Sequence, residues 1–539
     1  MRQPPNYSRI AVLLWLLITI AIALVVLMVA SENERLVAAR TIWLGICASL
    51  IALPLGSLIA WASRGQGLIP RVLFVCNIVL LFVPMFIHVS SWDAAFGKLG
   101  WLTSTKGQVL VPLVSGWTAA TWIHGVAAAP YVALILTIGL NLGRRTFEEQ
   151  ALLDTDAAGV FWHITIRRIC PLLVAAFVWI VISSAREIAV TDLYQIGTVA
   201  EQVYLGYSLG LSSIAGKWTA DQLAEAGELN PVITIAVIGW LAVTAFWLFF
   251  RLTNFVHQSG TVESSRATKS TAKQNFAGAL ALILLVAIPV GNVLMRACFF
   301  VQPVDGTPTT GYSVTQLFHS VRRSCIDYQN EFVWSFLISL VSSTLILLLA
   351  SVSAFAAQRS RVGQLVFVGA LATCCALPGP YIGTLLAGLL SNVDNETIRW
   401  FYNYTIAAPV IANLIFCWPA GALVVWFVFR KIPEDAMESA RVDGAGWVTR
   451  FTQFGVRANP ISLLGCWLIT FAFCFGELSA SQIVRPAGID TVPRKMLGDL
   501  HAGVNELTAG ITILMAIAIV TISLTGWCFL QLNRRVIGR

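Results

Sequence analysis

Two short clusters of acidic and small residues recur in this chain with the same spacing. Each member of the first cluster has a partner of its own type 289 positions later (438 − 149 = 289): Glu149 and Glu438, Ala151 and Ala440, Asp154 and Asp443. The correspondence runs without a gap from 149–171 to 438–460, so the chain contains an internal repeat. Carboxylates accept hydrogen bonds from basic or backbone donors, and alanine permits close approach. These residues can therefore approach another surface closely and meet basic or backbone donors on it.

Both clusters lie in polar loops between long apolar runs. In the second loop, apolar residues at helical spacing predict a short amphipathic helix, and Gly444 is expected to end it. Trp447 and Phe451 follow and are expected to anchor the loop on the neighbouring spans.

This pattern resembles the EAA loop of the membrane subunits of type I, binding-protein-dependent ABC importers. The second loop supplies Glu438, Ala440 and Gly444, whereas the first has Gln150 and Thr155 in place of an alanine and the glycine. The resemblance implies that each loop is a coupling helix that fits a cleft on one subunit of an ATPase dimer. It also implies an extracytoplasmic solute-binding protein as a second partner.

The stretch after the second loop is most similar to ferric-iron permeases, which often fuse two halves in one chain. It reads Gly-Glu-Leu-Ser-Ala at 476–480 and Arg-Pro-Ala-Gly-Ile-Asp-Thr at 485–491. Ferric iron is therefore the expected solute, and thiamine, polyamine, phosphonate and sulfate or molybdate stay open as alternatives.

Ionisable residues near the ends of apolar runs are candidates for the solute path or for the contact between halves. Arg186 and Glu187 end one run and Glu477 ends another; the two glutamates lie 290 positions apart (477 − 187 = 290). Pro84 and the pair Pro378 and Gly379 interrupt the third span of each half, a pattern typical of broken helices that line a pathway. Packing of small residues explains the interruptions equally well.

Composition defines the class of protein. Hydrophobic residues make up 57% and charged residues 12% of the 539, with a mean hydropathy of +0.77. These values predict an all-α, polytopic membrane protein, and about twelve spans can be placed. The loops assigned to one side, together with both termini and both EAA-like loops, hold most of the 35 lysine and arginine residues, so that side is expected to be cytoplasmic.

The spans divide the chain into two six-helix halves. The first half covers 1–252 with its EAA-like loop at 149–171, a Ser/Thr-rich cytoplasmic linker covers 253–275, and the second half covers 276–539 with its loop at 438–460. The first span is placed at 10–30. Pro171 and Pro231 are expected to open the fifth and sixth spans.

Other functions find little support in the sequence. Neither Lys98 nor Lys217 is followed by the Ser or Thr of a phosphate-binding loop, so ATP hydrolysis is assigned to a separate subunit. No spacing indicates a catalytic site, a metal site or a cofactor, and the net charge of +8 is attributed to cytoplasmic loops rather than to nucleic acid. The expected location is a bacterial plasma membrane, in contact with lipid. The alternative is an ion-coupled secondary transporter in which Glu187 and Glu477 carry protons.

Overall fold

The computed structural model describes residues 15–537 except 16, 23, 25, 27, 107–108, 143–144, 211–230, 259–268, 305–306, 359 and 392. Eight of the described helices are long and apolar enough to cross a membrane, and the number reaches 11 if each of three bent helix pairs is one span. Helices prevail because a backbone in lipid must satisfy its own hydrogen bonds. The chain is a multi-pass membrane protein built from α-helices.

The eight unbent spans are long apolar helices of the described residues in which no sharp break occurs. One of them is a composite helix that contains a π-helical turn. They are α2 (Glu32–Ala62), α5 (Gly116–Leu142), α8 (Ile166–Arg186), α12 (Pro231–Gln258), α13–η3–α14 (Ala272–Leu282, Ile283–Ala287, Ile288–Ala297), α16 (Gln329–Ala357), α20 (Ala407–Phe429) and α25 (Glu506–Ile537). Helix α2 begins with a capping box, in which Ser31 accepts from the Glu34 amide and Glu34 accepts from the Ser31 amide.

Three further helix pairs are bent sharply at a short break. The bend is 112° between α3 (Leu68–Leu80) and α4 (Met85–Phe96), and 95° between α17 (Arg361–Ala376) and α18 (Gly379–Ser391). It is 77° between α22–η4 (Trp447–Arg450, Phe451–Arg457) and α23 (Pro460–Phe475). The predicted interruption of the third span in each half is confirmed. What the sequence treats as one span is two helices that run in different directions.

Shorter elements connect the spans. The helical ones are α6 (Arg145–Asp154), α7 (Ala157–Val160), η1 (Phe161–Thr165), α9 (Ala189–Leu193), α10 (Val199–Ser208), α15 (Val314–Asp327), α19 (Glu396–Tyr404), α21 (Glu434–Val442) and α24 (Val492–Ala502). Two antiparallel hairpins pair β1 (Ser104–Lys106) with β2 (Val109–Val111), and β3 (Phe299–Val304) with β4 (Thr307–Tyr312). The all-α prediction holds for the spans but omits these hairpins.

Helices from the two halves of the sequence are interleaved. Helix α12, late in the first half, packs on α17, whereas α13 packs on α2 and α3, and α14 packs on α4. The two largest clusters of buried apolar side chains both contain residues from each half. The halves therefore share their cores.

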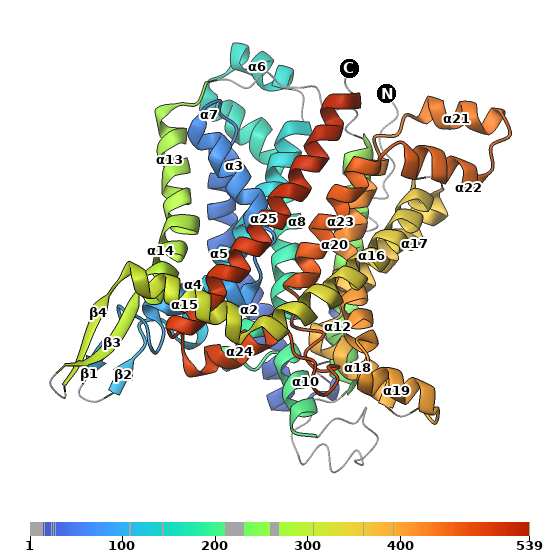
Figure 1. Ribbon diagram of the computed structural model, residues 1–539. Helices are drawn as coiled ribbons and strands as arrows, with labels where there is room; N and C mark the ends of the chain where they lie inside the picture. The colour runs from blue at the N-terminus through green and yellow to red at the C-terminus, as the bar shows by residue number, and fades with distance from the viewer. Residues whose placement is uncertain are drawn as a thin grey trace.

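The bundle has two distinct ends. In Figure 1, α6, α21 and α22 lie at the upper end with the end of α25, and the hairpins, α10, α15, α19 and α24 lie at the lower end. We refer to these as the loop end and the hairpin end.

Some predicted boundaries change. The span at 10–30 lies largely outside the described residues, and so does the middle of the predicted linker, 259–268. Helix α12 continues to Gln258, and α13 already begins at Ala272. Pro231 opens α12 as predicted, but Pro171 does not open a span. It lies inside α8, because the preceding π-helical turn η1 runs directly into that helix.

Candidate functional site

The two EAA-like loops have the same order of elements in the same register. Helix α21 begins at Glu434, and the position 289 residues earlier, Arg145, begins α6 (434 − 145 = 289). In each loop a four-residue helix and then a π-helical turn follow. Both loops lie at the loop end of the bundle (Figure 1). The sequence repeat is thus matched by a structural repeat on one face of the protein.

Gly444 ends α21 as predicted. Its φ of 81° lies in the left-handed region, which favours glycine. The Gly444 amide donates to the Arg441 carbonyl at 3.1 Å and the Ala445 amide to the Ala440 carbonyl at 2.9 Å. These two bonds form a Schellman motif, which satisfies carbonyls that the helix end leaves free. The chain can therefore turn sharply from α21 into α22.

Aromatic rings fix the second loop to the spans. Trp447 and Phe451 stack with centroids 5.4 Å apart, and both rings meet the edge or face of Phe355 in α16, at 5.7 and 5.4 Å. Phe429 at the end of α20 joins them 6.0 Å from Phe355. The predicted anchoring role of Trp447 and Phe451 is thus matched by contacts to two spans.

The first loop is attached differently. Thr155 takes the place of the helix-ending glycine, and Asp156 begins the next turn by accepting from the Gly159 amide at 2.8 Å. Trp162, which corresponds to Phe451, is 63% exposed. Glu149 lies in α6, but its side chain is outside the described part. The Trp162 side chain is therefore more exposed than its half-buried counterpart Phe451.

The two loops present matching surfaces to solvent. Asp154 and Asp443 are exposed, while Ala151 and Ala440 are half-buried; Glu438 is exposed as well. In each loop, the aliphatic residue directly before the aspartate is almost fully exposed. Leu153 is 86% exposed, and its counterpart Val442 is 87% exposed. An aliphatic side chain held in water beside acidic groups, twice at one register position, is typical of a contact surface for another protein. Leu153 and Val442 were not predicted from the sequence as a pair, although the 289-residue offset aligns one with the other.

Glu187 and Glu477 occupy equivalent turns. The Glu187 carboxylate follows α8 and accepts from the amides of Ala189 at 2.6 Å and Val190 at 3.1 Å. The Glu477 carboxylate follows α23 and accepts from the amides of Ala480 at 2.6 Å and Ser481 at 3.2 Å. Each carboxylate therefore closes the turn that follows its span.

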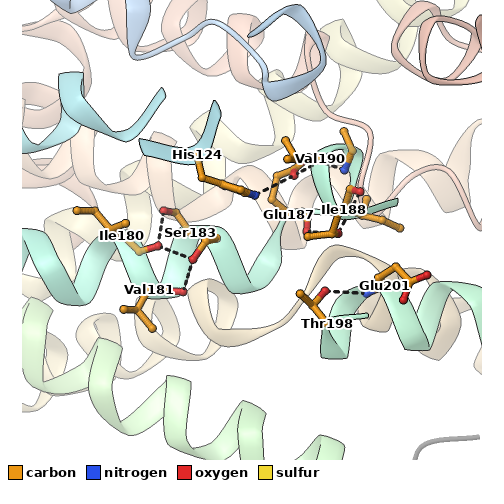
Figure 2. A network of polar contacts seen from close by, with 12 residues as sticks. His124, Ile180, Val181, Ser183, Glu187, Ile188, Val190, Thr198 and Glu201 are labelled. Carbon is orange, nitrogen blue, oxygen red and sulfur yellow. Dashed lines mark hydrogen bonds and ion pairs between the residues drawn. The ribbon is translucent and has the colours of Figure 1, made fainter. Parts of the chain in front are cut away.

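The neighbours of the two carboxylates differ. His124 of α5 points at Glu187, with 3.9 Å between Nε2 and Oε2, as Figure 2 shows. Position 413 (124 + 289) holds Asn413 on α20, and Pro130 and Pro419 inside the same two helices share this offset. Asn413 was not among the residues predicted from the sequence. Extending the repeat upstream of the loops would have aligned it with His124.

Arg186 joins the two halves. Its guanidinium donates to the Phe416 carbonyl of α20 at 3.2 Å and lies 4.1 Å from the centre of the Phe416 ring. Arg186 also attracts the Glu477 carboxylate electrostatically. The predicted half-interface position of Arg186 is thus matched by contacts across the chain repeat.

The two broken helices pack on the segment around Glu477. Pro84 abuts Gly476, where a Cβ atom would overlap the proline ring, and Gly379 abuts Ser479 and Ala480. The Leu81 carbonyl, freed by the first break, accepts from the Tyr131 hydroxyl at 2.6 Å. The predicted pathway candidates Pro84, Pro378 and Gly379 therefore lie at the same junction as Glu477, whereas the EAA-like loops lie at the loop end.

At the hairpin end, an ion pair connects the halves. His501 Nε2 of α24 lies 3.4 Å from Asp192 Oδ2 of α9, and its Nδ1 lies 2.9 Å from the Leu497 carbonyl. Both ring nitrogens face acceptors, so the imidazolium fits best. The hydrogen bond to Asp192 raises the pKa of His501 above its ordinary 6.5, although burial and Lys98 oppose it.

We expect this ion pair to make stability depend on pH. Because the folded-state pKa of His501 is raised, its contribution is fully present below about pH 6.5 and is lost as pH rises through the raised value. The His501 side chain is 47% exposed, so the contribution is below about 1 kcal/mol. The apparent Tm of the purified protein between pH 6 and 9 measures it.

Glu201 provides the check on this measurement. Burial first, and then Asp192, raise the pKa of Glu201 from 4.5 to about 7. Deprotonation of Glu201 therefore lowers the stability of the folded protein as pH rises from 4.5 through about 7. His501→Gln removes the imidazolium and keeps Glu201. An unchanged decline of Tm above pH 7 in this variant contradicts the assignment.

No group of three His, Cys, Asp or Glu residues suited to a metal ion occurs in the described ranges. The described residues place two repeated EAA-like loops at one end, and two buried carboxylates in the turns after α8 and α23. Neither a scan against protein-family models nor a comparison with curated proteins returns a match for this chain.

Proposed function

We propose that the chain is the transmembrane permease of an ATP-driven ABC importer and that it couples to separate ATPase subunits. The observation that carries the proposal is the pair of EAA-like loops, which share register and elements and lie at the same end of the bundle. Two equivalent surfaces on one face suit a dimeric partner. An ion-coupled transporter gives no reason for the shared pattern of the two loops.

The proposal implies an orientation of the protein in the membrane. The loop end, with the end of α25, faces the cytoplasm of a bacterial cell and binds the ATPase dimer. The hairpin end receives solute from an extracytoplasmic binding protein. Residues 10–30 supply a twelfth span, which gives two six-span halves and two cytoplasmic termini.

Ferric iron is the proposed solute. Its support is the similarity of 476–480 and 485–491 to ferric-iron permeases. Thiamine, polyamine and phosphonate are the next choices. In this scheme Glu477, Arg186 and the broken helices form the part of the path where the halves meet.

The test of the coupling proposal targets the exposed aliphatic pair. Leu153→Asp together with Val442→Asp places charge where an apolar contact forms, which costs about 1–3 kcal/mol per site and weakens binding about tenfold per site. We expect the wild-type chain, purified from its own cells in mild detergent, to carry ATP hydrolysis activity. The double variant is expected to lose most of it.

Leu209→Asp is the matched control. Leu209 is 61% exposed and follows α10 at the hairpin end, so this substitution adds the same charge away from the loops. Equal ATP hydrolysis in the double variant and the control would refute coupling through the loops.

The second candidate function is an ion-coupled secondary transporter. The approach of His124 to Glu187 favours it, because a histidine beside a buried carboxylate can exchange protons. Uptake of ferric iron into vesicles that persists without ATP and stops when the proton gradient is collapsed would establish it. Uptake that requires ATP and ignores the gradient would exclude it.

A further inference from the structure

A small polar hollow lies beside Glu477. It measures about 10 Å³, room for one water-sized particle, and it lies between α16, α20 and the segment that leads into α24. Its polar wall consists of Ser335, Ser339, Asn413, Glu477, Ser481 and Thr491. All of these side chains offer oxygen atoms, and the wall contains no cationic group.

Two groups in this wall are buried without full compensation. Glu477 is 6% exposed, and in the described part of the chain no Lys, Arg or His nitrogen lies within 4 Å of its carboxylate. Asn413 is 2% exposed, and its amide oxygen has no hydrogen-bond partner. A buried charge needs a counter-charge, and a buried carbonyl needs a donor or a cation.

The internal repeat allows the surroundings of Glu477 to be compared with those of Glu187. In the first half, the His124 ring lies against the equivalent carboxylate, Glu187. In the second half, the same position holds Asn413, which is shorter and carries no positive charge. The exchange leaves space beside the Glu477 carboxylate and an unpartnered amide oxygen on Asn413 where the imidazole would be.

We propose that this hollow binds a small alkali cation, held by the carboxylate of Glu477, the amide oxygen of Asn413 and the neighbouring hydroxyl oxygens. Hard cations prefer carboxylate, carbonyl and hydroxyl oxygens, and a bare alkali ion needs about the room of one water. The ion occupies the place beside the carboxylate that the His124 ring occupies in the first half. It thereby holds α20 to the turn after α23.

An adjoining hollow gives the site a route to the hairpin end. It shares Ile338, Ser481 and Thr491 with the first. At its far side, Asp490 lies 2.7 Å from Arg494 and 3.5 Å from Arg485, and all three are partly exposed. The proposed cation site therefore lies one layer inside the surface.

The experiment measures the apparent Tm of the purified chain in detergent, with no ATPase or solute present. Sodium, potassium and lithium chloride are each titrated against choline chloride at constant ionic strength. A site that binds only the folded protein gives a saturable rise, about 2–4 °C, with the ion that fits. Constant ionic strength separates binding from screening.

Two variants locate the effect. Glu477→Gln removes the charge, and Asn413→His replaces the amide oxygen by a ring that fills the hollow, so each is expected to abolish the alkali-dependent rise. Glu187→Gln, the equivalent change in the first half, is expected to keep it. Should Glu477→Gln not fold, Asn413→His alone decides.

Three results would overturn the proposal: the same Tm in choline and in all three alkali salts, which leaves an ordered water as the occupant; a rise that survives Glu477→Gln; or a rise that survives Asn413→His. None of them bears on the coupling loops, because no ATPase takes part. The proposal on the importer and the proposal on the cation site thus stand or fall separately.

Discussion

Glu438→Lys combined with Gly444→Pro is expected to leave the chain in the membrane but to detach it from its ATPase. Proline requires a φ near −65°, whereas Gly444 has a φ of 81°, and proline also removes the amide that donates to Arg441. Strain of this kind costs about 1–3 kcal/mol, so the native loop becomes a minor state and apparent affinity falls about tenfold to hundredfold. Lysine at 438 adds the wrong charge on the exposed face.

The measurement compares ATP hydrolysis that co-purifies with the variant and with the wild type, after membrane content has been equalised. Gly446→Pro is the matched control, because Gly446 has a φ of −63°, lies in the same loop and directly precedes α22 as its N-cap. We expect the control to behave as the wild type. Full ATPase content in the double variant would remove α21 from the coupling mechanism.

Gly379→Ala is expected to loosen the junction of broken helices. An added Cβ would overlap the Ser479 side chain and backbone and approach the Ala480 amide, all of which belong to the turn closed by Glu477. Forced overpacking costs about 1–3 kcal/mol. Because Gly379 is the first residue of α18, the substitution destabilises the break between α17 and α18.

Gly369→Ala is the control for this prediction. Gly369 lies inside α17, and a Cβ there would meet no atom within 4 Å, so alanine should stabilise the helix by up to about 1 kcal/mol. The apparent Tm is therefore expected to fall for Gly379→Ala and to stay or rise for Gly369→Ala. A Tm that is equal in the two variants would show that the junction yields without cost.

The sequence was most informative where a pattern occurs twice. The offset of 289 aligned Asp154 with Asp443, and the structure gives both loops the same elements in that register. Gly444 was predictable because a left-handed helix end strongly favours one residue type. A single polar loop read alone would have carried much less information.

Local signals failed where tertiary packing decides. Pro171 was predicted to open a span, but the π-helical turn η1 continues directly into α8. Pro171 therefore lies inside that helix. The interruption at Pro84 was predicted, but the size of its bend, 112°, was not, because hydropathy gives the length of an apolar run and not its direction. The hairpin of β3 and β4 had its own signal in Asp305-Gly306, a turn dipeptide between residues that favour strands, and it was masked by the surrounding spans.

The interleaved helices have a consequence for biogenesis. Helix α12 packs on α17, about a hundred residues further along the chain, and α13 returns to cover α2 and α3. When the first half leaves the ribosome, these faces meet lipid or the insertion machinery rather than their final neighbours. Carrying both halves on one polypeptide ensures that the missing surfaces arrive in equal number and at the same place.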